Sequence, residues 1–529
     1  MTYRVLATDK LAPQGVEVFR ASPEIEFDSK PGMPPAELAA AIGGYDALVI
    51  RSGTRVTEEI LREPGRLRVI GRAGIGVDNI DVAAATKKGI VVMNTPGGNN
   101  VTTAEHTITL MLALARWIPQ ADASLHAGKW ERGKFEGTEI CNKTLGIIGL
   151  GNIGTIVAER AQGLRMRIIA FDPFITAEAA ARLRVEIVSL DELYARADFI
   201  TVHTPLTPET RGLVNAAAIA KMKKGVRLVN CARGGIIDEQ ALADAIVSGH
   251  VAGAALDVFV EEPPPADHPL LRLPQVIATP HLGASTSEAQ INVAVAIAEQ
   301  VTKFLLRGEV ESAVNMPSVS REMLTLLRPH LSLGEKLGSL LAQLSPDPVS
   351  ELSVEYAGQV AELDSRPVTN AILRGLLSPF LDAAVNYVNA PAIARERGIK
   401  VRESRASRSS AFVNSITVSV VRSSGVREVE GALFGSNILR LVRIDDFYME
   451  AVPEGYVLML NNRDVPGVVG RVGTLLGARG INIAGLELGR ERVGGRAISF
   501  FHVDDAVPEP VLAELRRSPD IISAQLLKL

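Results

Sequence analysis

Three short motifs carry side chains that could act together on a small organic acid. The stretch VNCARGGIID places Arg233 directly after an apolar run. DVFVEEPP places Asp257, Glu261 and Glu262 after a second such run. TPHLGAST places His281 after a third. A guanidinium matches a carboxylate with its planar fork, and an imidazole exchanges protons near neutral pH. These are the two functions needed for hydride transfer from a secondary alcohol that bears a carboxylate.

The residues alone leave the identity of the base open. His203, in TVHTP, also ends an apolar run, and neither composition nor spacing separates it from His281. His106 lies within an apolar helical segment, and the remaining histidines lack a matching context. Two candidates for the base therefore remain.

A fourth motif predicts a dinucleotide-binding turn. LGIIGLGNIG contains Gly149, Gly151 and Gly154 in the GxGxxG spacing, after an apolar run and at the start of a helical segment. The first glycine permits a tight turn, the second lets the backbone approach a pyrophosphate, and the third allows the helix to pack on the strand. The next apolar run ends in Asp172, whose carboxylate would bind the ribose hydroxyls and repel a 2'-phosphate. The motif favours NAD over NADP.

Two series of apolar runs must form the scaffold for these residues. Six runs between residues 144 and 279 alternate with helical segments, as in a doubly wound parallel sheet with ligands at the carboxyl ends of its strands. A similar series occupies residues 3–94, and a helical run over 287–306 is expected to pack back on it. Residues 101–127 are predicted to form one long helix. After residue 317 the pattern changes to that of α+β units.

Composition limits the possible partners. The 529 residues carry 56 Lys and Arg against 60 Asp and Glu, a net charge of -4, which steers the chain toward neither nucleic acid nor an acidic membrane. The apolar helical runs contain polar residues and are too short to span a membrane. Two cysteines and a first segment without the features of a signal peptide favour the cytoplasm. We expect small-molecule ligands and no metal site.

The four motifs together resemble those of the D-isomer-specific 2-hydroxyacid dehydrogenases, over residues 1 to about 317. The resemblance implies that Arg233, Glu262 and His281 are catalytic. Arg233 would clamp the substrate carboxylate and polarise the C2 oxygen, while the Glu262–His281 pair would supply acid/base catalysis. Contacts to NAD are implied for a larger set: Asn152, Ile153, His203, Thr204, Cys231, Ala232, Arg233 and Asp257.

The chain length and the segment NNRDVPGVVGRVGTLLGARGINIAGLEL are similar to a long subfamily of these dehydrogenases that ends in an ACT domain. The implied fold is α/β, with a Rossmann-type doubly wound NAD domain (99–287) and a flavodoxin-like, discontinuous substrate domain (1–98 and 288–317). An α+β intervening domain (318–453) and a ferredoxin-like ACT domain (454–529) would follow. The subfamily oxidises D-3-phosphoglycerate to 3-phosphohydroxypyruvate with NAD, the first step of L-serine biosynthesis, and forms homodimers or homotetramers.

The substrate phosphate needs cations and hydrogen-bond donors of its own. VIRSGTRV supplies Arg51 at the end of an apolar run, with Ser52 and Gly53 behind it, and TPGGNN supplies Asn99 and Asn100. A third stretch, GKWERGKF, supplies Arg132 and Lys134, and in the subfamily this loop reaches across a dimer interface. These last two side chains could equally lie on a solvated loop.

The C-terminal half is expected to bind effectors. In the ACT pattern L-serine would meet Asn462, Asp464 and Asn482, although position 462 departs from the aromatic residue or histidine of that pattern. The ACT module could instead serve mainly to dimerise. The intervening domain carries a basic run that would bind an anion or form a solvated face: Arg395, Arg397, Lys400, Arg402, Arg405 and Arg408.

Two other functions stay open at this stage. A dehydrogenase of another D-2-hydroxy acid would carry the same four motifs, although the long extension after residue 317 counts against it. A non-catalytic binding protein on the same fold could use NAD as a ligand without turnover, because fold alone does not decide function.

Overall fold

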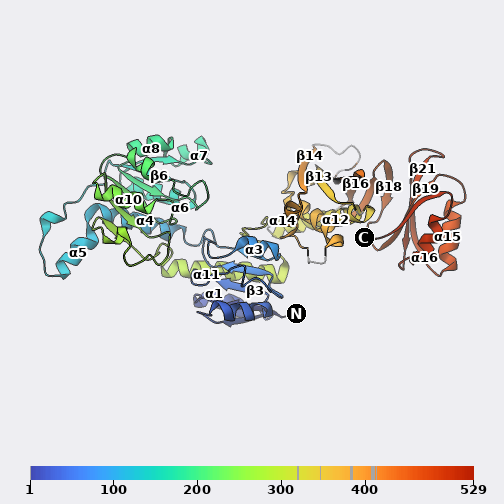
Figure 1. Ribbon diagram of the computed structural model, residues 1–529, viewed down its shortest axis with the longest axis horizontal. Coiled ribbons are helices and arrows are strands. Elements are labelled where there is room, and N and C mark those ends of the chain that lie inside the picture. The colour runs from blue at the N-terminus through green and yellow to red at the C-terminus, as the bar shows by residue number, and fades with distance from the viewer. Residues whose placement is uncertain are drawn as a thin grey trace.

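Four β-sheets organise the chain, which a computed structural model describes for residues 2–318, 321–345, 347–381, 385–406, 412, 414–435 and 437–529. Two parallel sheets are followed by one mixed and one antiparallel sheet, which confirms the expected fold class. Figure 1 shows an elongated molecule with the second sheet at one end, the first near the middle and the last two at the other end.

The first sheet has the order β2-β1-β3-β4-β5 and only parallel neighbours among its described strands. This is the order of flavodoxin-like sheets. Its elements are β1 (Tyr3–Ala7), α1 (Pro13–Arg20), β2 (Ile25–Ser29), α2 (Pro35–Ala41), η1 (Ile42–Gly44), β3 (Ala47–Ile50), β4 (Val69–Arg72), α3 (Val82–Lys87) and β5 (Val91–Met93).

The helix α11 (Ser287–Arg307) packs on this first sheet although it follows the second one in sequence. Its residues Ile297 and Val301 are fully buried in the core of the first sheet. They lie so close to β4 that a Cβ atom on Gly71 would be 2.8 Å from the Ile297 side chain. The chain therefore returns to its first unit after completing the second.

The second sheet is parallel and has the order β12-β11-β10-β9-β6-β7-β8. The direction of winding reverses between β9 and β6, and doubly wound sheets bind ligands at the carboxyl ends of the strands beside such a point. All six predicted strands are present, and the short, exposed β8 is an addition that the sequence analysis did not predict. The strands are β6 (Thr144–Ile148), β7 (Arg167–Phe171), β8 (Glu186–Ile187), β9 (Phe199–Val202), β10 (Val226–Asn230), β11 (Val251–Leu256) and β12 (Val276–Ala278).

Helices cover both faces of the second sheet, and one prediction about them is wrong. Residues 101–127 do not form a single helix, because Trp117 adopts a left-handed conformation (φ 56°) and ends the first one. Pro119 follows, and a proline inside a helix removes a hydrogen bond and clashes with the preceding turn. The helical segments are α4 (Asn100–Arg116), α5 (Ile118–His126), η2 (Arg132–Lys134), α6 (Asn152–Gly163), α7 (Ala177–Arg182), α8 (Leu190–Arg196), α9 (Ala216–Ala220), α10 (Glu239–Val247) and η3 (Pro269–Arg272).

The third unit is a mixed sheet of order β14-β13-β15-β16-β17-β18 with α12 and α13 packed together on it. As predicted, a leucine-rich helix opens the unit and two long strands form its centre. Its elements are α12 (Arg321–Leu344), β13 (Val349–Gly358), η4 (Gln359–Glu362), α13 (Arg366–Leu377), η5 (Ser378–Phe380), α14 (Ala390–Glu396), β14 (Lys400–Ala406), β15 (Asn414–Arg422), β16 (Gly425–Phe434), β17 (Ile438–Ile444) and β18 (Phe447–Ala451).

The last unit is a βαββαβ module with the antiparallel order β20-β21-β19-β22, which is the ferredoxin-like arrangement. Its elements are β19 (Tyr456–Arg463), α15 (Val468–Ala478), β20 (Ile483–Arg490), β21 (Arg496–Val503), α16 (Glu509–Arg516) and β22 (Ile521–Lys528).

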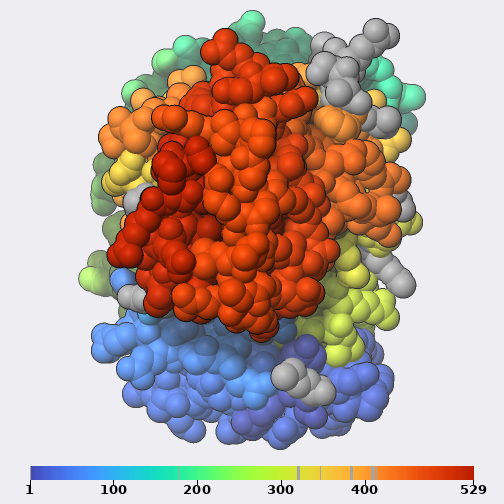
Figure 2. Space-filling model, turned by 90° about the vertical axis from the view of Figure 1, so that its right-hand side faces the viewer, coloured from blue at the N-terminus to red at the C-terminus, as the bar shows by residue number. Residues whose placement is uncertain are grey.

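One face of this last sheet is buried against the third unit. Val457, Met459 and Phe500 belong to the same continuous core as the leucines of α12. Figure 2 shows the third and last units in direct contact at that end of the molecule. No helix in the described parts of the chain is long and apolar enough to cross a membrane.

Candidate active site

A cavity of about 560 Å³ lies where the first two units meet. The first unit contributes Ser52, Arg72 and Asp78 to its wall. The start of α4 and the loops after the strands of the second sheet supply the predicted residues Asn99, Asn100, Asn152, Ile153, His203, Thr204, Cys231, Ala232, Arg233, Glu262 and His281. Most of the residues predicted from four separate motifs therefore share one cavity.

Arg233 projects from the end of β10 and bridges the two units. Its Nε donates to a carboxylate oxygen of Asp78 at 2.9 Å, and its Nη1 donates to the carbonyl of Ala232 at 2.7 Å. The next residue, Gly234, lies against the backbone of Phe259, which a Cβ atom at position 234 would strike. The guanidinium is thus held at the cavity by one backbone carbonyl and one exposed carboxylate.

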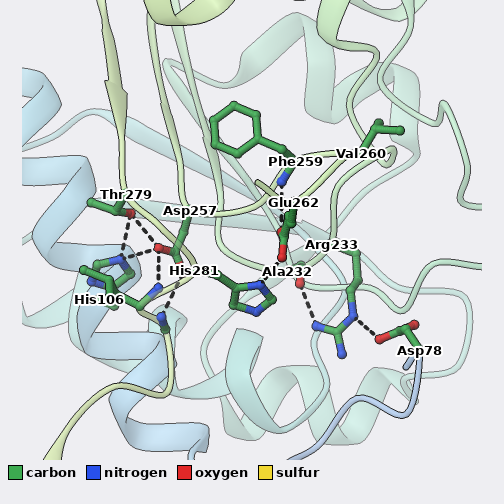
Figure 3. Close-up of polar contacts among 12 residues, drawn as sticks. Asp78, His106, Ala232, Arg233, Asp257, Phe259, Val260, Glu262, Thr279 and His281 are labelled. Atoms are coloured by element: carbon green, nitrogen blue, oxygen red, sulfur yellow. Dashed lines mark hydrogen bonds and ion pairs between the residues drawn. The ribbon is translucent and has the colours of Figure 1, made fainter. Parts of the chain in front are cut away.

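His281 and Glu262 form a hydrogen-bonded pair. Their Nδ1 and Oε2 atoms are 2.7 Å apart, and the other Glu262 oxygen accepts a hydrogen bond from the Phe259 amide. Partial burial opposes ionisation of Glu262, but the hydrogen bonds from His281 and Phe259 and the charge of His281 together outweigh it, so the pKa of this carboxyl lies below its usual value. Figure 3 shows Glu262 and Arg233 on one side of the imidazole.

Asp257 holds the turn that carries His281. His281 has a left-handed backbone (φ 54°), and the amides of Leu282 and Gly283 donate to the Asp257 carboxylate at 2.7 and 2.8 Å. Asp257 does not line the cavity, and its side chain is fully buried. Its predicted contact with NAD has no direct support in this arrangement.

His106 of α4 also interacts with the Asp257 carboxylate. Sequence reasoning did not predict this contact. Nε2 of His106 lies 3.1 Å from the carboxylate, which also accepts a hydrogen bond from the Thr279 hydroxyl at 2.5 Å (Figure 3). Burial of Asp257 opposes ionisation, but these donors outweigh it and lower the pKa of the carboxyl. No sequence signal distinguishes His106, because Glu105, Thr107 and other polar residues surround it in the first half of α4.

The glycine turn has the expected geometry. Gly149 adopts a positive φ of 95°, and α6 begins at Asn152 directly after Gly151. Asp172 follows β7, and its carboxylate accepts hydrogen bonds from the amides of Leu150 and Phe174. The carboxylate is therefore fixed beside the turn, where it could receive ribose hydroxyls.

Several polar atoms in the cavity wall are buried without a partner in the structure. They are Nδ1 of His203, the hydroxyl oxygen of Thr204, and the amide oxygens of Asn99 and Asn100. Burial lowers the pKa of His203 to about 4, so this ring is neutral at physiological pH. Cys231 is buried and its pKa is raised to about 12, which keeps it a thiol. Unpaired buried polar groups are costly, so these atoms fit a polar ligand such as NAD.

Only some of the residues predicted to bind the substrate phosphate line the cavity. Ser52, Asn99 and Asn100 line the cavity, whereas Arg51 and Gly53 do not. The Arg51 side chain donates to the carbonyl of Lys10. Arg132 and Lys134 are exposed in η2, next to the projecting helix α5 (Figure 1).

Arg72 is the cation that sequence reasoning missed. It ends β4 and lines the cavity, and its Nε is buried without a partner. Burial together with repulsion from Arg233 lowers the pKa of this guanidinium to about 10, so it keeps its charge at neutral pH. The stretch RVIGRAG has the same form as VIRSG, an arginine at the end of an apolar run, and could have revealed it.

The predicted effector residues are each engaged within the last unit. Asn462 is buried, and its amide joins the Ser499 hydroxyl and the Arg463 carbonyl. Asp464 accepts a hydrogen bond from the amide of Gly494, and Asn482 donates to Asp504. In the intervening domain Arg402 pairs with Glu351, and Arg408 lies outside the described residues.

Three family models match consecutive parts of the chain. They are the NAD binding domain of D-isomer specific 2-hydroxyacid dehydrogenases (residues 108–283), the D-3-phosphoglycerate dehydrogenase intervening domain (326–445) and the ACT domain (456–520). The D-3-phosphoglycerate dehydrogenase of Bacillus subtilis is 44% identical over 527 residues, which cover 100% of both chains. The chain belongs to the D-3-phosphoglycerate dehydrogenase family.

Solved structures agree with this membership of the D-3-phosphoglycerate dehydrogenase family. A protein from Thermus thermophilus is 34% identical with a TM-score of 0.55, over 59% of this chain and 99% of its own. An Aquifex aeolicus D-lactate dehydrogenase, solved with NAD and lactic acid, is 28% identical with a TM-score of 0.52, over 60% of this chain and 100% of its own. The NAD-binding domain predicted from the glycine motif is thereby confirmed.

Proposed function

We propose that this chain catalyses the NAD-dependent oxidation of D-3-phosphoglycerate to 3-phosphohydroxypyruvate, the first step of L-serine biosynthesis. One observation carries the proposal: a guanidinium and a carboxylate-paired imidazole face one cavity that is also lined by a second, half-buried arginine whose Nε is buried. The first two groups serve any 2-hydroxy acid, and the second cation suits a substrate with a phosphate.

His281 is the base. Its Nδ1 is engaged with Glu262, which leaves Nε2 free to take the proton of the C2 hydroxyl. His203 is poorly suited to this task, because its Nε2 lies 3.0 Å from the Thr201 hydroxyl and its pKa is about 4. The low pKa of His203 therefore favours His281 as the base. NAD, when bound, accepts the hydride from C2.

Arg233 binds the substrate carboxylate and polarises the C2 oxygen. Its present partner, Asp78, has a side chain that is 64% exposed, so an incoming carboxylate can replace it at small cost. The planar fork holds the acid in one orientation and fixes C2 relative to His281.

Arg72 and Ser52 bind the phosphate, with Asn99 and Asn100 at the start of α4 as further polar contacts. A charged guanidinium with a free buried Nε is a strong donor to a phosphate oxygen. The charge of Arg51 also contributes to lowering the pKa of Arg72, so the two side chains lie near each other. Arg51 is therefore a second candidate to bind the substrate phosphate.

Residues on the second unit's side of the cavity would hold the dinucleotide. The amides at the start of α6 would receive its pyrophosphate, and Asp172 would receive the adenosine ribose. The unpaired atoms of His203 and Thr204, with the neighbouring Cys231 and Ala232, would be available to the rest of the cofactor.

We extend the proposal to regulation and assembly, which the ACT domain and the family resemblance support. The ACT domain binds L-serine through Asp464 and Asn482, and the buried Asn462 supports the site from behind. The chain forms a homodimer or homotetramer, and the projecting α5–η2 segment with Arg132 and Lys134 lies at the interface. Calorimetry with L-serine and sedimentation of the protein test these two statements. No heat of binding would refute the first, and a monomer at micromolar concentration would refute the second.

Replacing His281 with alanine tests the catalytic assignment. Turnover of D-3-phosphoglycerate should fall about 100- to 10,000-fold, while NAD still binds. Steady-state rates with unphosphorylated D-glycerate test the substrate assignment in the unaltered protein. Equal efficiencies for the two acids would exclude a phosphate site, and full turnover by His281→Ala would exclude this base.

A further inference from the structure

Glu262 sits on a loop without regular structure, which must be held in place by side chains. The loop runs from Asp257, after β11, to His268, before η3. Its first half forms part of the cavity wall through Phe259, Val260 and Glu262. Since Glu262 itself is substantially exposed, its position depends on how the backbone beside it is fixed.

A carboxylate behind the cavity fixes this backbone. Glu239 is the first residue of α10, and its Oε1 accepts a hydrogen bond from the amide of Val260 at 2.7 Å. A negative side chain in the first turn of a helix is favoured by the helix dipole. The amide of Phe259, next to Val260, donates to Glu262 itself. Two consecutive amides of the loop, those of Phe259 and Val260, therefore donate to Glu262 and Glu239 respectively.

A histidine completes this support. Nε2 of His268 lies 3.0 Å from the second oxygen of Glu239, and its ring meets the ring of Phe259 edge-on at 5.6 Å. The two side chains are only 12% and 18% exposed, so solvent screens their interaction weakly. Neither residue lines the cavity.

We infer that Glu239 and His268 are positioning residues, which hold the Phe259–Glu262 loop so that Glu262 meets His281 in the orientation that catalysis requires. The inference rests on the proposed function, because it assigns these residues a role in that reaction. They touch neither substrate nor cofactor and act through Val260 and Phe259. The loop is also pressed against Gly234, so the same support keeps Arg233 and Glu262 in register.

The test measures hydride transfer directly, because product release limits turnover in many enzymes. Formation of NADH in a single turnover, with D-3-phosphoglycerate and NAD, should be about 10- to 100-fold slower in His268→Ala, since small displacements of a catalytic group have effects of this size. NAD affinity by calorimetry should stay within about twofold of the unaltered protein, because the support lies outside the cavity.

Conservative variants separate positioning from general stability. The amide nitrogen of a glutamine can replace Nε2 as donor to Glu239, so His268→Gln should recover most of the lost rate. Glu239→Gln keeps the acceptor for Val260 and should show a smaller loss than His268→Ala. His250 is a matched control in the same unit: it is half-buried and bonds the carbonyl of Ile219. His250→Ala should lower the melting temperature without slowing hydride transfer.

Several results would overturn the inference. A wild-type rate of hydride transfer in His268→Ala is the simplest of them. A loss that His268→Gln does not recover, or one matched by an equal loss of NAD affinity, would also refute it. Failure of the proposed function is recognised separately, because His281→Ala would then retain turnover whatever His268 does.

Discussion

At the scale of single residues, two cations line the cavity, and a third, Arg51, lies near one of them with different surroundings. Arg233 is paired with an exposed carboxylate, Arg51 with a backbone carbonyl, and Arg72 is half-buried with an unpaired, buried Nε. We predict that Arg72→Gln raises KM for D-3-phosphoglycerate about 10- to 100-fold, since a hydrogen bond to a charged group contributes about 1.5 to 3 kcal/mol. The affinity for NAD should not change. Steady-state kinetics with Arg51→Gln as comparison would rank the two arginines, and an unchanged KM in Arg72→Gln would contradict the assignment.

A second prediction at this scale concerns the buried ring of His203. Folding lowers its pKa from 6.5 to about 4, so between these values the unfolded chain binds a proton that the folded chain does not. The free energy of unfolding should therefore fall as the pH drops from 6.5 towards 4, by about 2 kcal/mol on reaching pH 5. Urea unfolding at pH 7 and pH 5 checks this, with His203→Asn as the variant that lacks the titration. If both proteins lost equal stability, the ring would not be the cause.

At the scale of elements, we expect two glycines of the same turn to have different roles: Gly154 in folding and Gly151 in the binding of NAD. A Cβ atom on Gly154 would strike the carbonyl of Gly149, whereas one on Gly151 would meet no atom within 4 Å. Gly154→Ala should lower the free energy of unfolding by about 2 kcal/mol or more, because strand and helix must separate. Gly151→Ala should leave stability unchanged but lower the affinity for NAD, because the added methyl group would enter the space that the pyrophosphate needs. Thermal unfolding and calorimetry with NAD measure both effects, and a stable Gly151→Ala that binds NAD normally would contradict this use of the turn.

At the scale of the whole molecule, the last two units depend on each other. One face of the ACT sheet lies in the core of the intervening domain, and Gln343 of α12 forms hydrogen bonds with the backbone of Lys528. Truncation after residue 453 would expose that core, so we predict aggregation and a lower melting temperature. Truncation after residue 317 removes both units together, so the shortened chain should not aggregate. Light scattering of the two truncated chains tests this, and a dispersed, stable chain ending at 453 would show that the units are independent.

The coupling also bears on how an effector could act. Asn386 of the intervening domain donates to the carbonyl of Gly89 in the first unit, and Lys87 pairs with Glu396. A chain of packed contacts thus runs from the ACT sheet through the third unit to the sheet that carries Arg72. Any signal from the ACT domain to the cavity has this path available within one chain.

The sequence by itself determined the fold class and nearly half of the residues in the cavity wall. The turn at Gly149 and the motifs around Arg233, Glu262 and His281 follow from local rules, because the ends of parallel strands converge at one edge of a sheet. The break at Trp117 was missed although Pro119, two residues later, is a local signal of a new helix start. Such local patterns identify which residues stand at strand ends.

Only the tertiary structure decided how these residues are paired. Arg233 meets Asp78 across 155 positions of sequence, and Asp257 meets His106 across 151. Arg72 joins the site because the first unit, on which α11 packs, contributes part of the wall of the cavity between the first two units. Contacts between units depend on the relative placement of separately folded sheets, and no local periodicity encodes that placement.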